Sequence, residues 1–106
     1  MIKKLNTTGN MYYFYFDKTT LALMKLDPGT SKLLIEINDN IMYIKKATEK
    51  DLNSKENLFI KDIKRIGSGY GFYFNQSILE YLNLKPETDN VEINIKNNTI
   101  TLKKAC

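Results

Sequence analysis

The side chains of this sequence that could do chemistry are mostly cations. There are 16 basic residues against 12 acidic ones, which gives a formal net charge of +4, and fifteen of the basic residues are lysines. Arg65 is the single arginine, so it alone can make a fork-shaped, two-point contact with a phosphate or a guanine edge. An excess of cations suits an anionic partner such as nucleic acid, although small lysine-rich proteins also carry one for solubility alone.

The groups that catalysis usually needs are scarce. The sequence has no histidine, which is the commonest acid–base group near neutral pH and the commonest metal ligand, and its one cysteine is Cys106. One thiol can form neither an internal disulfide nor a thiolate zinc cluster. The glycines of GSGYG, residues 67–71, lack the lysine and hydroxyl residue of a phosphate-binding loop. We therefore expect no enzymatic activity, no cofactor and no metal.

The elements that position the cations follow from an internal repeat. Residues 1–47 align with residues 59–105 without a gap at a constant offset of 58, and identical pairs such as Gly9/Gly67 and Pro28/Pro86 fall on turn and core positions. Between the copies lies TEKDLNSKENL, an 11-residue polar stretch typical of a linker. The sequence thus predicts a first repeat at 1–47, a linker at 48–58 and a second repeat at 59–106, with the two repeats forming one barrel.

Each copy begins with two predicted strands. A short opening strand, 2–5 or 59–66, leads into a glycine-bearing loop at Gly9 or at residues 67–71. The aromatic runs MYYFYF and YGFYF then alternate at the period of a strand, which gives each run two faces. One face is predicted to pack in the core: Tyr12, Phe14, Phe16, Tyr70, Phe72 and Phe74.

A short helix and a hairpin complete each copy. Asp17 and Asn75 are favourable N-cap residues, and Ser77-x-x-Glu80 has the pattern of a capping box. A helix of about two turns must end before the proline that follows it. Alternating aliphatic residues at 33–37 and 91–95, followed by Asp-Asn or Asn-Asn and a return strand, predict the hairpin. The fold class is therefore mainly β with short helices.

This order of elements, ending in Lys-Lys-Ala, resembles the AbrB/MazE/SpoVT family of small DNA-binding regulators. The resemblance is closest over residues 65–105 and looser over residues 7–47. It implies that the two repeats exchange hairpins to form a pseudo-twofold, swapped-hairpin AbrB-like β-barrel. It also implies that the barrel binds duplex DNA as a transcriptional regulator, with basic residues on its opening strands and loops.

The candidate DNA-contacting residues come from matching that family's opening strand and loop to this sequence. They are Lys3, Lys4, Asn6, Thr7, Asn10, Lys61, Lys64, Arg65 and Ser68. Cations among them would hold phosphates and the polar side chains would contact base edges. The alternative is that these lysines form a solvated strand edge that discourages aggregation. The repeated lysines 45, 46, 103 and 104 end strands and are expected to aid solubility.

A second hypothesis is a protein-interaction module, antitoxin-like or inhibitory, on the same barrel. Tyr13, Tyr15 and Tyr73 lie on the aromatic face opposite the predicted core and are its candidate contact surface. For assembly, the linker raises the effective concentration of one repeat near the other, so a monomeric pseudo-dimer is expected, with a homodimer as the competing arrangement. The sequence has no apolar run long enough to span a membrane and no apolar signal core, so a cytoplasmic location is expected.

Overall fold

The computed structural model describes residues 2–49 and 59–105. Its elements in chain order are β1 (Ile2–Lys3), β2 (Asn6–Thr8), β3 (Met11–Phe16), α1 (Lys18–Leu23), β4 (Lys32–Asn38), β5 (Ile41–Lys46), β6 (Phe59–Asp62), β7 (Lys64–Ile66), β8 (Gly69–Phe74), α3 (Gln76–Tyr81), β9 (Val91–Lys96) and β10 (Thr99–Lys104). The protein is mainly β with short helices, as predicted. Most of the predicted linker, residues 50–58, lies outside the described residues.

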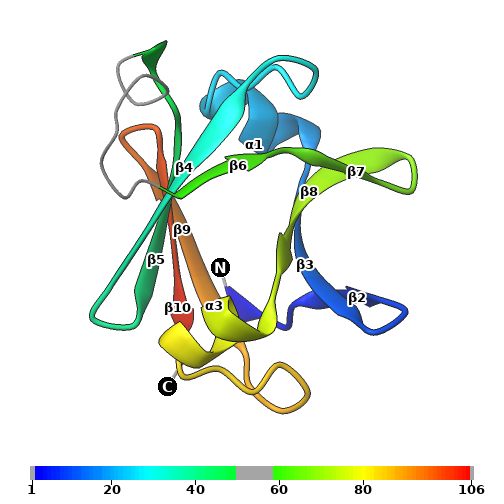
Figure 1. Ribbon diagram of the computed structural model, residues 1–106, viewed down its shortest axis with the longest axis vertical. Helices are drawn as coiled ribbons and strands as arrows, with labels where there is room; N and C mark the ends of the chain where they lie inside the picture. The colour runs from blue at the N-terminus through cyan, green and yellow to red at the C-terminus, as the bar shows by residue number, and fades with distance from the viewer. Residues whose placement is uncertain (1, 50–58, 106) are drawn as a thin grey trace.

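The described strands form two antiparallel sheets (Figure 1). The larger has the order β1-β9-β10-β5-β4-β6 and the smaller the order β2-β3-β8-β7. β1 pairs with β9 and β6 pairs with β4, so each opening strand joins the hairpin of the other half of the chain. When each strand is replaced by its counterpart 58 residues away, each sheet order is reversed, so the same pairs of strands remain neighbours. No strand pairing among the described residues joins one sheet to the other, so a closed barrel is not observed there.

Each opening strand is broken, which differs from the single strands predicted at 2–5 and 59–66. The breaks fall at residues 4–5 and at Ile63, and the side chains of Leu5 and Ile63 are buried in the core. At these points the chain leaves the larger sheet and enters the smaller one, because β1 and β6 belong to the first while β2 and β7 belong to the second. Residues 6–8, which follow the strand predicted at 2–5, therefore form β2.

Both helices begin at the predicted N-caps. The Asp17 carboxylate accepts the Thr20 amide at 2.7 Å, and the Asn75 side-chain oxygen accepts the Ile78 amide at 2.9 Å. The Ser77 capping box is wrong, because α3 already begins at Gln76. The hydrogen bond from Thr20, helped by the charge of Lys3, holds the pKa of Asp17 below its ordinary value of 3.8.

The two predicted hairpins also form. Their turn residues all have positive φ, between 52° and 63°: Asp39, Asn40, Asn97 and Asn98. Two successive left-handed residues are what a tight hairpin turn of type I′ requires, and aspartate and asparagine tolerate this conformation better than most residues do.

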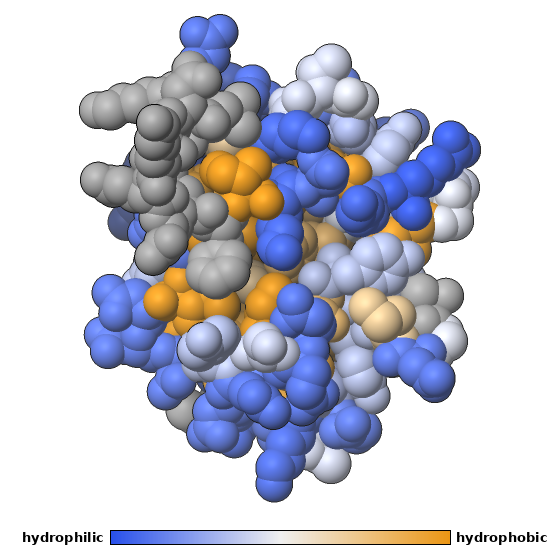
Figure 2. All heavy atoms as spheres, in the orientation of Figure 1, coloured by the Kyte–Doolittle hydropathy of each residue, from blue (hydrophilic) through white to orange (hydrophobic). Residues whose placement is uncertain are grey.

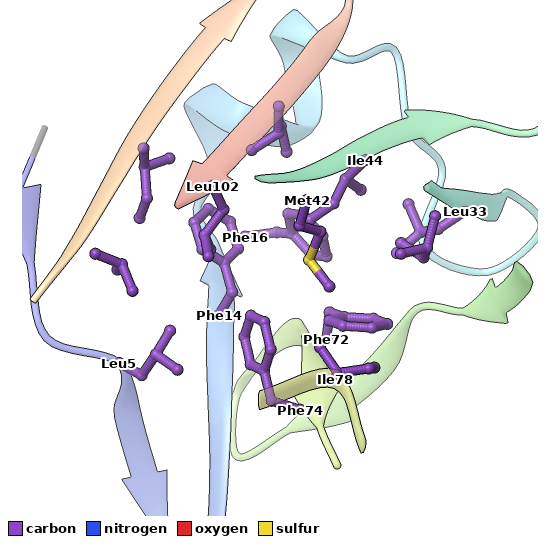
Figure 3. Packing of buried hydrophobic residues seen from close by; sticks show 14 of the residues in the cluster. Leu5, Phe14, Phe16, Leu33, Met42, Ile44, Phe72, Phe74, Ile78 and Leu102 are labelled. Carbon is purple, nitrogen blue, oxygen red and sulfur yellow. The ribbon is translucent and has the colours of Figure 1, made fainter. Parts of the chain in front are cut away.

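The core lies between the two sheets. Phe14, Phe16, Phe72 and Phe74 point from the smaller sheet toward aliphatic side chains of the larger one, such as Leu102 (Figure 3). The predicted aromatic core face is thus confirmed at its four phenylalanines, while its two tyrosines are partly buried against the cluster. A radius of gyration of 13.3 Å is close to the ~13 Å typical of a compact chain of this length.

Candidate nucleic-acid interface

The smaller sheet carries most of the predicted DNA-contacting residues at its two edges. β2 and β7 are these edges, and the turns that follow them project from the same side of the molecule (Figure 1). Each turn contains a glycine in the left-handed region, with φ of 57° at Gly9 and 60° at Gly67. The exposed turn residues Asn10 and Ser68 therefore occupy equivalent positions at the two tips.

Lys64 and Arg65 lie exposed on β7. Arg65 Nε donates to the carbonyl oxygen of Gly67 at 3.5 Å, and neither side chain has an ion pair among the described residues. Both cations are thus available to an anion approaching this edge. Contact of these two residues with DNA stays a prediction.

Lys3 and Lys61 do not lie with these exposed cations. They pair with Val91 and Leu33, whose side chains are buried in the core, so both lysines are on the inner face at the ends of the larger sheet. Lys3 Nζ lies 5.3 Å from the centroid of the Phe14 ring, and both lysines are half-buried. The sequence placed them on an open strand edge because it gave no sign of which sheet each opening strand would join.

The first half offers a weaker cationic surface. Lys4 is exposed, and its ammonium lies 3.5 Å from the backbone oxygen of Glu87. Asn6 is half-buried opposite Tyr13 on the outer face of the smaller sheet, and Thr7 is exposed on β2. The positions equivalent to Lys64 and Arg65 are thus neutral here.

A basic cleft of about 250 Å³ adjoins β7, and it includes a cation that the sequence analysis did not select. Lys32, Lys64 and Arg65 line it together with Asp62 and the turn at residues 28–31. Lys32 forms an ion pair with Asp62. The hydrogen bond that Lys32 Nζ donates to the Asp62 carboxylate, together with the positive charge of Lys32, holds the pKa of Asp62 below its ordinary value. With three cations and one carboxylate, the cleft has the charge to accept a phosphate.

Lys32 had no signal in the sequence, since its counterpart at the 58-residue offset is Asn90. It reaches the cleft only because β4 pairs with β6, which places Lys32 opposite Asp62. Among the lysines expected to aid solubility, Lys103 and Lys104 pair with Glu92 and Asp89 at 3.3 and 3.6 Å, whereas Lys46 Nζ donates to the Lys25 carbonyl oxygen at 3.2 Å. These pairs agree with the surface role expected for them.

The outer face of the smaller sheet is aromatic. Tyr13 and Tyr73 are cross-strand partners in edge-to-face contact, with ring centroids 6.1 Å apart. Tyr15 is opposite Gly71, where a Cβ atom would come within 2.6 Å of the Phe14 carbonyl oxygen. Glycine at this position therefore permits a close backbone approach. The three tyrosines are half-buried and retain surface for a contact.

Comparisons of the chain with protein-family models, curated proteins and solved structures give no match. Within residues 2–49 and 59–105, no helix has the length and apolarity to cross a membrane. In the same part of the chain, no group of three or more acidic, cysteine or histidine residues is arranged to hold a metal ion.

Proposed function

We propose that the protein is a small DNA-binding regulator that holds duplex DNA at the β7 edge. The observation that carries the proposal is the basic cleft, where Lys64 and Arg65 are exposed without a carboxylate partner among the described residues. Neutralising DNA phosphates with such cations releases condensed counterions, which supplies the sequence-independent part of the affinity. Arg65 is able to make the two-point contact that a guanine edge or a phosphate accepts.

The proposal includes a swapped-hairpin arrangement like that of the AbrB/MazE/SpoVT family. Pairing of β1 with β9, and of β6 with β4, supports an exchange between the two halves. In that arrangement one chain supplies both repeats, so a monomeric pseudo-dimer is the proposed assembly and the cytoplasm the proposed location. The two edges then differ in charge, and a DNA target without exact twofold symmetry fits them better than a palindrome does.

The second candidate is a protein-interaction module, and the outer aromatic face favours it. Tyr13, Tyr15 and Tyr73 combine apolar area with hydroxyl groups, as contact residues at protein interfaces often do. Such a contact depends far less on salt than binding through phosphates does.

The experiment that separates the two candidates is a salt series of DNA binding. The protein is titrated into labelled duplex from the region around its own gene and into an unrelated duplex. A steep loss of affinity as salt rises supports DNA binding, and tighter binding to the first duplex supports regulation. No binding even at low salt would contradict the proposal and favour the protein-interaction module.

A further inference from the structure

Residues of β6 and α3, which both lie toward the viewer in Figure 1, line a groove. Two adjoining hollows form it, of about 330 and 280 Å³, and they share Lys61, Asn75 and Ile78 in their linings. In the same orientation, Figure 2 shows hydrophobic surface gathered in the centre of this face with hydrophilic side chains around it. The second hollow approaches the ~300 Å³ of the smallest ligand pockets.

The walls of the second hollow are mainly aliphatic. Ile35 and Ile37 of β4 and Ile78 of α3 line it. Tyr81 lies at its rim with 62% of its surface exposed, which is unusual for an aromatic residue. These side chains suit an apolar body of a few carbon atoms.

The polar groups of this hollow are hydrogen-bond donors. Lys61 is half-buried, and its ammonium has neither an ion pair nor a hydrogen bond among the described residues. The Asn75 oxygen is occupied by the Ile78 amide, so the Asn75 NH₂ group is left to donate. The Ser77 hydroxyl is the third donor in the lining. One cation and two neutral donors match a ligand that carries one negative charge.

The first half of the chain has different chemistry at the equivalent positions. Asp17 stands at the position equivalent to Asn75, and Thr20 stands where the second half has Ile78. There Lys3 lies over the Phe14 ring and close enough to Asp17 to affect its titration. The second half thus has a donating amide where the first has a carboxylate that repels anions, and an aliphatic side chain where the first has a hydroxyl.

We propose that the groove between β6 and α3 binds a small apolar carboxylic acid, with its carboxylate at Lys61 and Asn75 and its apolar body against Ile35, Ile37 and Ile78. A carboxylate fits better than a phosphate monoester, because the second hollow supplies one cation. A doubly charged phosphate monoester needs more than one cation to balance its charge when it is removed from water. The first hollow shares Asp62 and Lys64 with the basic cleft, whereas the second hollow shares no lining residue with it. The proposal does not depend on DNA binding.

The test uses octanoate as the probe and the full-length protein labelled at its isoleucine methyl groups and side-chain amides. Saturable NMR shifts are expected at Ile35, Ile37, Ile78 and the Asn75 NH₂ group. 1-Octanol, which has the same chain without the charge, should bind at least tenfold more weakly. Equal binding of octanol and octanoate, or shifts confined to other residues, would overturn the proposal.

Two variants examine the carboxylate site. Asn75→Asp keeps an N-cap acceptor, so α3 should be preserved while octanoate affinity falls at least tenfold. Lys61→Gln should cause a similar loss. Asp17→Asn is the matched control, since it changes the equivalent cap in the first half and should leave binding in this groove unchanged. If Asn75→Asp retains its fold by circular dichroism and its affinity for octanoate, the assignment of the carboxylate site is wrong.

Discussion

Replacing Lys64 and Arg65 together by glutamine should weaken DNA binding without unfolding the protein. Both side chains are exposed on the edge strand β7, and among the described residues the one hydrogen bond that they make joins Arg65 to the Gly67 carbonyl oxygen. Exposed substitutions of this kind usually change stability by no more than about 0.5 kcal/mol. A loss of affinity would therefore report on the interface.

The size of the effect follows from the number of cations removed. Each phosphate contact contributes about −0.9 to the slope of log affinity against log salt, so removing two should make the slope shallower by about 1.8. Between 50 and 200 mM salt, two such contacts account for a roughly twelvefold change in affinity. Lys32 remains in the cleft but is paired with Asp62, so it cannot fully replace them.

The assay is fluorescence anisotropy of a labelled duplex across that range of salt. The matched control is Lys103→Gln with Lys104→Gln, which removes the same charge from lysines paired with Glu92 and Asp89. Its slope should stay close to that of the wild type. Equal loss of slope in both double variants would mean that net charge alone drives binding, and an unchanged slope in the β7 variant would refute a role for the cleft.

Four further outcomes are expected. Asp62→Asn frees Lys32 from its ion pair, so DNA affinity should rise and the salt slope should steepen by up to about 0.9 in the same assay. Leu84→Ala should lower the unfolding free energy by about 2–5 kcal/mol in urea titrations, because Leu84 is buried in the core, whereas Ile95→Ala should cost less because Ile95 is only partly buried. Asp17→Asn keeps the helix cap but removes a carboxylate whose pKa is lowered in the folded protein. The ionised carboxylate stabilises the fold above pH 3.8, and this stabilisation is lost as pH falls through the folded pKa. The wild type should therefore lose more stability than the variant in acid. Light scattering at micromolar protein should give a mass near 12.3 kDa, and a stable mass of twice that value would contradict the proposed monomeric assembly.

The features predicted correctly from the sequence are those with local causes. Asp17 and Asn75 cap helices through amides three residues ahead, and the positive φ of the hairpin turns requires only suitable residues at adjacent positions. The buried phenylalanines follow from alternation within a single strand. Each of these signals lies within a few residues, so the rest of the fold was not needed to interpret it.

The errors concern features that depend on distant pairing. Leu5 and Ile63 break the opening strands because the chain changes sheets there, and nothing in the short pattern around either residue marks the change. The inward position of Lys3 depends on its pairing with Val91. Lys32 reaches Asp62 through the same kind of pairing between halves, which local periodicity does not contain.

The two halves share one scaffold but differ in the charges that they place on it. At the 58-residue offset, Lys64 and Arg65 correspond to Asn6 and Thr7, so the basic cleft belongs to one edge of the smaller sheet. A symmetric assembly of identical chains would carry every such substitution twice. Because the two halves lie in one chain and differ in sequence, one edge is neutral at these positions while the other carries two cations. The proposed interface therefore has a defined polarity, and its preferred DNA should bind in one orientation.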